Sequence, residues 1–276
     1  MKRPKAPLPS LPPGSTLVDT HCHLDMSAYD GRLNTVIAAA RQHGISRMVT
    51  IGIDTTSSGR AIELARQHEG IFATVGIHPH NAEQVTAAEL DRLAVLAREP
   101  NVVGFGEIGL DYVKNYAPRE AQIRAFTDQL HLAKELALPV VIHDREAHAD
   151  TCRILREAGP LPRGGVLHCF SGDLRLAHAA FDLGLYISIP GVVTYANAKV
   201  LRAVVAEVDP DRLLLETDAP FLTPVPFRGK VNEPVMMLYT AQMVADVRKC
   251  SLAEIAQTTT ANATRLFGFQ EAAHDD

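Results

Sequence analysis

The chain has 276 residues, of which 46% are hydrophobic, and its formal net charge is −5 at pH 7. This composition suffices for one large domain or two small ones, and the negative charge argues against a broad electrostatic grip on duplex DNA. No apolar run approaches the roughly 18 residues of a membrane span, so we expect no membrane partner. The four cysteines form no C-x-x-C pair, which favours a reduced, cytoplasmic setting.

Short apolar runs alternate with helix-length amphipathic segments, after a basic, proline-rich lead at residues 1–15 that we expect to be disordered. The predicted strands are 16–20, 46–51, 71–77, 102–105, 139–143, 165–168, 185–189 and 212–216. The predicted helices are 32–43, 57–68, 87–98, 119–136, 145–157, 174–183, 198–207, 233–248 and 252–267.

Eight β/α units in about 250 residues are typical of an α/β protein with a closed (β/α)8 TIM barrel. We expect a single barrel domain over residues 16–269 and an acidic tail at residues 270–276. An open doubly wound sheet is the main alternative, but it would leave most strand ends chemically quiet.

The stretch GFGEIG, from Gly104 to Gly109, fits the G-x-G-x-x-G fingerprint of dinucleotide-binding proteins. The predicted strand 102–105 precedes it, but the next helical pattern starts only near Pro118. In addition, Glu107 would set a carboxylate beside the phosphates. The fingerprint is therefore weak evidence for a nucleotide site, and the position of Glu107 at the end of a strand needs another explanation.

Six of the twelve histidines lie at or just beyond the C-terminal ends of predicted strands, as do Glu107 and Asp218. In a barrel these ends converge on one mouth, so residues far apart in the sequence become neighbours. The six are His21, His23, His78, His80, His143 and His168. Four imidazoles and two carboxylates suffice for two divalent ions, and Glu107 could bridge them.

The most specific local signal is VDTHCHLD, because residues i and i+2 of a strand face the same side. His21 and His23 can thus hold one metal ion while Cys22 faces away. The alternative is two histidines that only cap a strand. His143 and His168 end apolar runs, where an imidazole without a partner is costly; each alone is more often a hydrogen-bonded core histidine.

The sequence resembles the TatD-like metal-dependent deoxyribonucleases, which belong to the metallohydrolases of the amidohydrolase type. The resemblance spans residues 17–267 and is carried, in order, by LVDTHCHLD, GIHPH, GFGEIGLDY, PVVIHDREAHADT, LHCFSG, YISIPGVVTY, LLLETDAPFLTP and RGKVNEP. It implies a TIM barrel with two divalent ions (Mg²⁺, Mn²⁺ or Zn²⁺) that acts on DNA. By matching motifs, the implied metal ligands are His21, His23, Glu107, His143, His168 and Asp218.

Other polar residues near the expected mouth are candidates for contact with substrate phosphates. His78 and His80 either contact phosphate or hydrogen-bond within a tight proline turn. Arg145 either binds phosphate or pairs with carboxylates on its predicted helix. Glu216 is expected to orient a metal ligand. The loop after the eighth strand adds three more candidates: Arg228, Lys230 and Asn232.

Together these features predict a hydrolase that cleaves phosphodiester bonds in DNA, at strand ends or in single strands, with no obligate protein partner. Asp218 would accept a proton from the attacking water, Glu107 would bridge the ions, and Arg228 or Lys230 would steady the phosphate. One alternative is a metallohydrolase of the same fold that acts on small esters, amides or acyl-tRNA. Another is a metal-binding scaffold without turnover, which has no need of an acid at position 218.

Overall fold

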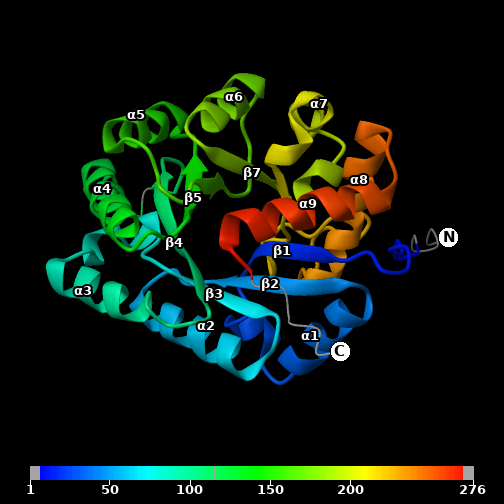
Figure 1. The fold of residues 1–276 in the computed structure, drawn as a ribbon, viewed down its shortest axis with the longest axis horizontal. Helices are drawn as coiled ribbons and strands as arrows, with labels where there is room; N and C mark the ends of the chain where they lie inside the picture. Colours follow the sequence, from blue (N-terminus) through cyan, green and yellow to red (C-terminus); the bar gives the residue numbers. More distant parts are fainter. Residues whose placement is uncertain (1–6, 115, 270–276) are drawn as a thin grey trace.

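The computed structural model describes residues 7–114 and 116–269, and its strands form one parallel sheet ordered from β1 to β8. The strands are β1 (Leu17–Cys22), β2 (Ile45–Ile51), β3 (Ile71–Val75), β4 (Val102–Asp111), β5 (Val140–Arg145), β6 (Gly165–Leu167), β7 (Leu185–Ile189) and β8 (Leu213–Leu215). A bridge between Cys22 and Ala219 links β1 to the chain after β8. The sheet is therefore a nearly closed barrel (Figure 1), and the predicted TIM barrel is confirmed.

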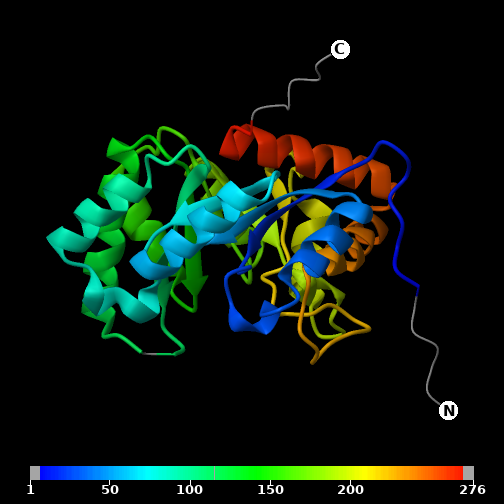
Figure 2. The same cartoon turned by 90° about the horizontal axis from the view of Figure 1, so that it is seen from below.

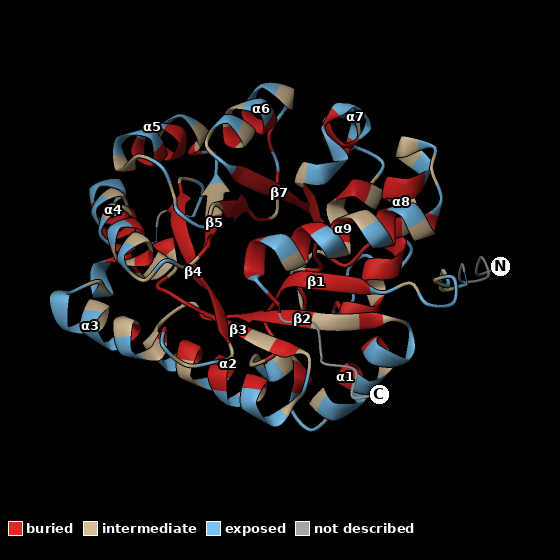
Figure 3. Cartoon of the chain, viewed as in Figure 1, coloured by how far each residue is buried: buried red, intermediate tan, exposed pale blue. Residues whose placement is uncertain are grey.

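The helices surround the barrel and turn their buried faces toward the strands (Figure 3). They are α1 (Leu33–Gln42), α2 (Thr55–Gln67), α3 (Ala87–Leu96), α4 (Arg119–Glu135), α5 (His148–Ala158), α6 (Leu174–Asp182), α7 (Lys199–Glu207), α8 (Met237–Arg248) and α9 (Leu252–Phe267). Asp54 and Ser251 form capping boxes at the start of α2 and α9, which satisfy backbone N–H groups that a helix leaves free. Short 3-10 turns occupy Ser27–Tyr29, Pro79–Gln84, Gly191–Thr194, Pro210–Arg212 and Pro234–Met236.

Helix α9 closes the N-terminal end of the barrel, where it lies across the strands (Figure 2). Apolar residues near the strand starts form one buried cluster with Ala263, Leu266 and Phe267 of this helix. The strand members of the cluster are Val18, Val49, Ile51, Val103, Val141, Val166, Tyr186 and Leu214. This end is a packed hydrophobic layer, so polar side chains inside the barrel collect at the opposite, C-terminal end.

Strand β4 continues to Asp111, whereas the sequence predicted its end at Phe105. Its register against β5 shifts between Phe105 and Ile108, as in a β-bulge. Glu107 therefore lies inside the strand and not at its end, which corrects the predicted position. A β-bulge changes the direction in which nearby side chains point, and this one lies at Glu107.

Beyond the bulge, β4 and β5 share a regular register in which Gly109 pairs with His143 and Asp111 pairs with Arg145. Side chains alternate along a strand, so Glu107, Gly109 and Asp111 face one side. Arg145 is the last residue of β5 and does not belong to the helix in which it was expected, because α5 begins only at His148.

The described part of the proline-rich lead contacts the hydrophobic core. Leu8 and Leu11 are partly buried and pack against it. Residues 1–6 and the predicted acidic tail at 270–276 lie outside the described residues. Over the ranges that the structure covers, none of the helices combines the length and the apolar character needed to cross a membrane.

The close approach of β4 to β5 requires glycine at position 109. A Cβ added there would overlap the backbone carbonyl of His143, and the φ of Gly109 is +138°. We expect Gly109→Ala to lower the free energy of unfolding by more than about 2 kcal/mol. Gly59→Ala is the control, because a Cβ on Gly59 in α2 meets nothing within 4 Å and raises helix propensity. Urea unfolding of both variants tests this, and a wild-type midpoint for Gly109→Ala would contradict it.

Candidate metal centre

Glu107 lies at the centre of the barrel mouth, and its side chain is only 3% exposed. Its Oε1 lies 2.7 Å from His143 Nδ1, 2.7 Å from His168 Nε2 and 3.4 Å from His78 Nε2. Its Oε2 points elsewhere and lies 3.4 Å from His21 Nε2. The two oxygens of one carboxylate therefore face two different sets of histidines.

The set on the Oε2 side, here called the first group, consists of His21, His23, Glu107 and Asp218. Ligand atoms of His21, His23 and Glu107 all lie within 4.8 Å of one another. Asp218 Oδ1 lies 3.7 Å from His21 Nε2 and 3.4 Å from His23 Nε2. The backbone N–H of Asp218 donates to the carbonyl of His21 at 2.9 Å, which ties the loop after β8 to β1.

The set on the Oε1 side, here called the second group, consists of His78, Glu107, His143 and His168. Ligand atoms of His78, Glu107 and His143 also lie within 4.8 Å of one another. His168 Nε2 lies 3.2 Å from His143 Nδ1. Across the site, the rings of His168 and His21 stack with centroids 3.9 Å apart and planes at 8°. The stacked rings place the two groups directly side by side.

Asp111 is a site residue that the sequence reasoning missed. It is fully buried, and its Oδ2 lies 2.9 Å from His80 Nε2, 3.3 Å from His143 Nε2 and 3.8 Å from Arg145 Nη1. Its two-residue alternation with Glu107 and Gly109 was the signal that could have revealed it. The structure thus brings His80 and Arg145 to the second group through a shared carboxylate.

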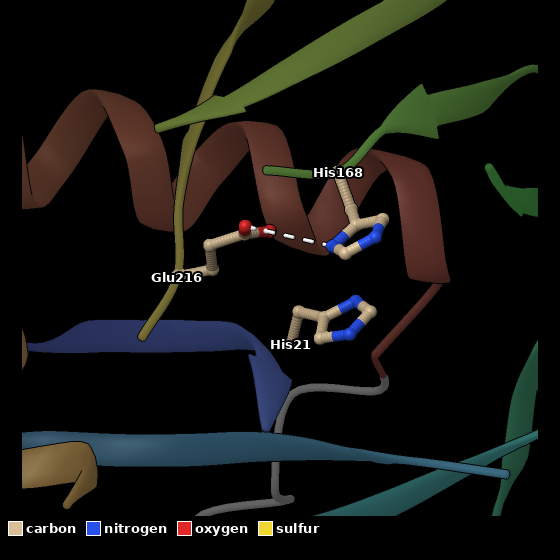
Figure 4. A group of neighbouring side chains, drawn as sticks. All are labelled: His21, His168 and Glu216. Atoms are coloured by element: carbon tan, nitrogen blue, oxygen red, sulfur yellow. Dashed lines mark ion pairs between the residues drawn. The ribbon is translucent and has the colours of Figure 1, made fainter. Parts of the chain in front are cut away.

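Two further buried carboxylates support the histidines. Asp19 accepts hydrogen bonds from Thr217 N at 3.0 Å and from Thr217 Oγ1 at 2.5 Å, so it fixes the residue before Asp218. Burial raises the pKa of Asp19 to about 7. Glu216 Oε1 accepts from the backbone N–H of Cys169 at 2.6 Å and lies 3.7 Å from Nδ1 of His168 (Figure 4).

Glu216 also forms, with His21 and His168, a third set of side chains whose ligand atoms lie within 4.8 Å of one another. In Figure 4 the carboxylate of Glu216 reaches toward one side of the His168 ring, while His21 lies beneath that ring. Because Nε2 of His168 faces Glu107, the contact on Nδ1 suits a carboxylate that orients a histidine ligand.

The charges at the centre are strongly coupled. Burial alone would raise the pKa of Glu107, but His168 and His78 hold it well below its ordinary value. Burial would likewise lower the pKa of His168, but Glu107 raises it well above its usual value. The pKa of His78 is lowered to about 4, chiefly by burial. The buried negative charge of Glu107 thus requires positive charge beside it.

The residues of both groups fit divalent metal ions. Both ring nitrogens of His21 and Nδ1 of His23 are buried without a hydrogen-bond partner. Buried polar atoms of this kind are rare and call for a ligand. Imidazole nitrogens together with carboxylate oxygens are donors that Zn²⁺ and Mn²⁺ accept, and carboxylates also suit Mg²⁺.

Of the six predicted substrate contacts, His78 and His80 are partly buried and lie beside Glu107 and Asp111. The other four are either exposed or buried. Arg145, Arg228 and Lys230 are exposed, and the guanidinium of Arg228 lies 4.4 Å from the ring centroid of Tyr195. Asn232 is fully buried, and its Nδ2 donates to the carbonyls of Thr217 at 2.9 Å and Phe221 at 2.6 Å. Its amide therefore braces the loop after β8 and is not free for a substrate, contrary to the expectation for Asn232.

A TIM barrel whose mouth gathers buried histidines around a shared carboxylate defines a metal-dependent hydrolase. A family model described as "TatD related DNase" matches residues 18–268. The chain therefore belongs to the TatD family, and the predicted resemblance is confirmed.

The relatives agree with this assignment. The "uncharacterized metal-dependent hydrolase YabD" of Bacillus subtilis is 42% identical over 251 residues, which cover 91% of this chain and 98% of the relative. The "3'-5' ssDNA/RNA exonuclease TatD" of Cronobacter sakazakii is 39% identical over 256 residues, which cover 91% and 97%. The crystal structure of YjjV, a TatD homolog from Escherichia coli K12, is similar with a TM-score of 0.87 and 33% identity, covering 92% and 98%.

The first group generates a prediction about metal content. If His21 and His23 share an ion, changing both to Ala removes two of its donors, so the protein should lose at least one metal equivalent and its activity. Elemental analysis of the purified, folded double variant measures this. His131→Ala is the matched control, because His131 is an exposed residue of α4. Unchanged metal content in the folded double variant would show that His21 and His23 are not metal ligands.

Proposed function

We propose that this TatD-family hydrolase uses two divalent ions to cleave phosphodiester bonds. The observation that carries the proposal is the arrangement of Glu107, whose two oxygens face two separate groups of histidines. The first group would hold one ion, the second group would hold the other, and Glu107 would bridge them. Asp111, whose Oδ2 lies 3.3 Å from His143 Nε2, would border the second ion. Mg²⁺, Mn²⁺ and Zn²⁺ all suit this mixed donor set.

The substrate we propose is single-stranded nucleic acid, or the end of a strand. Several relatives, such as the protein of Cronobacter sakazakii, carry the name "3'-5' ssDNA/RNA exonuclease TatD". The net charge of −5 argues against a broad electrostatic grip on continuous duplex. Several exposed cations near the mouth, among them Arg145, Arg228 and Lys230, suit contacts with a few phosphates.

Bound divalent ions would supply two things here: a lower pKa for water and neutralisation of charge on the phosphate. The protein's own residues then have separate tasks. Burial would raise the pKa of Asp218, but His23 and His21 hold it below its ordinary value, so the carboxylate is ionised and able to accept the proton of the attacking water. Arg228, whose guanidinium rests on Tyr195, would bind a phosphate oxygen. His80 and Arg145 would border the second group through Asp111.

We also propose a reduced, cytoplasmic setting. The four cysteines, Cys22, Cys152, Cys169 and Cys250, are all free in the structure. Persistent reduced thiols are typical of the cytosol. Cell fractionation with an antibody against the native protein tests this directly.

A turnover screen tests the substrate class. Single-stranded DNA, duplex DNA, RNA and small carboxylic esters are each offered to the protein with Mg²⁺, Mn²⁺ and Zn²⁺. We expect the highest kcat/KM on single-stranded nucleic acid, because phosphate contacts and ions at the mouth favour an anionic chain. Turnover confined to the small esters would replace the nuclease proposal with the alternative hydrolase.

The role of Asp218 as proton acceptor gives a sharper prediction. Asp218→Asn keeps the shape and one oxygen for coordination but cannot accept a proton, so kcat should fall by roughly 10²–10⁴-fold. Metal content and fold should stay close to wild type. The measurement is kcat across a metal titration, with Asp211→Asn, an exposed residue between α7 and β8, as control. Recovery of the rate at saturating metal would leave Asp218 as a ligand alone.

A further inference from the structure

Two aromatic side chains are exposed near the barrel mouth. Tyr116, in the loop after β4, is 65% exposed, and Phe221, in the loop after β8, is 49% exposed. They are the only strongly exposed aromatic residues among those that the structure describes. Of the other exposed large apolar residues that the structure describes, Val113, Val225 and Val231 belong to the same two loops, and Val95 and Val200 lie on helices. Apolar exposure is thus concentrated at the loops that border the metal centre.

Each aromatic ring contacts a histidine of the site, and the two do so on different sides. Phe221 lies against His23 of the first group, with ring centroids 6.0 Å apart and planes at 70°. Tyr116 lies against His80, with centroids 4.7 Å apart and planes at 89°. His80 in turn contacts Asp111 beside the second group. The aromatic pair, Tyr116 and Phe221, therefore lies on either side of the two histidine groups that share Glu107.

Hydrogen bonds anchor the backbone of Phe221 and the residue that follows Tyr116. Phe221 N donates to the carbonyl of Asp218 at 2.8 Å, and Asn232 Nδ2 donates to the carbonyl of Phe221 at 2.6 Å. Beside Tyr116, the carbonyl of Ala117 accepts from Gln122 Nε2 at 2.9 Å. Side chains on anchored backbone lose less entropy when a ligand covers them, so the exposed rings are prepared for binding.

Positive side chains accompany both rings. Lys114 lies two residues before Tyr116, and Arg228 and Lys230 follow Phe221 in its loop; all three are exposed. Exposed aromatic rings combined with cations are how proteins bind single-stranded nucleic acids without reading their sequence, because every base has a face that stacks. A small ester or amide would need neither feature.

We propose that Tyr116 and Phe221 are two base-stacking sites, one on each side of the scissile phosphate. This rests on the proposed function and deepens it, since it states how the substrate is held. One base would stack on each ring while the phosphate between them lies over Glu107 and its histidines. Stacking does not depend on the sugar, so DNA and RNA single strands would both bind, with little base preference. Paired bases are already stacked on each other, so duplex would have to fray first.

The wild-type protein tests this without any substitution. Short single-stranded DNA substrates carry a tetrahydrofuran abasic residue at the terminal nucleotide, at the penultimate nucleotide, or far from the end. We expect kcat/KM to fall about 5- to 140-fold for an abasic residue at either of the first two positions. The distant abasic residue should have no effect.

Variants then assign each base to its ring. Tyr116→Leu and Phe221→Leu keep apolar volume but remove the aromatic face, whereas Tyr116→Phe and Phe221→Tyr keep it. On intact DNA, each Leu variant should lose kcat/KM by the factor that the wild type loses on one of the two abasic substrates. On that abasic substrate, the Leu variant and the wild type should have the same kcat/KM. The ring-retaining variants should still discriminate between intact and abasic strands, which the Leu variants should no longer do at the nucleotide that the replaced ring contacts. Val95→Ala, at an exposed site on α3, is the control, and metal content verifies that each centre is intact.

The outcomes are distinguishable. Equal cleavage of intact and abasic strands by the wild type, or Leu variants that retain full activity on intact DNA, overturns the stacking sites while the nuclease proposal stands. If the wild type cleaves no nucleic acid with any of the three ions, the proposed function fails and the stacking sites fail with it. Stacking is also contradicted if the Leu variants lose activity while the wild type is insensitive to base removal. The rings would then only stabilise the conformation of their loops.

Discussion

The structure depends on one buried carboxylate. Glu107 is almost fully enclosed at the barrel mouth and has its pKa held far below the ordinary range by the histidines around it. A buried negative charge is costly unless neighbouring groups compensate it. The two oxygens of Glu107 meet histidines in different directions, His21 on one side and His143 and His168 on the other. A centre with two halves follows from that single side chain.

The two ends of the barrel differ in polarity, and this difference places Glu107 at the polar end. At one end α9 packs an apolar layer against the strand starts, and at the other the polar residues converge. Local irregularities then set the final geometry. The register shift in β4 positions Glu107, and Gly109 lets β4 approach the backbone of His143. Asp19 fixes the residue before Asp218 through Thr217.

The barrel and most of the centre could be predicted because both follow from repeating patterns. Strand ends meet at one mouth in any TIM barrel, so the positions of His21, His143 and Asp218 in the sequence sufficed. Asp111 was missed because Gly106 and Gly109 interrupt the apolar pattern of β4, which hides how far the strand runs. The burial of Asn232 was equally hidden, since the path of a long loop depends on contacts with distant segments. Sequence alone places residues near the mouth but does not show which way they turn.

The central proposal is that the carboxylate of Glu107 bridges two metal ions. The metal content of the Glu107→Ala variant tests it most directly. Elemental analysis of the wild-type protein, titrated with Mn²⁺ or Zn²⁺, should give two equivalents per chain. Glu107→Ala removes a donor from both groups and leaves their histidines without the shared negative charge. The account predicts that both ions are then bound much more weakly, in a protein that is still folded. Loss of one equivalent with the other bound at unchanged affinity would contradict it.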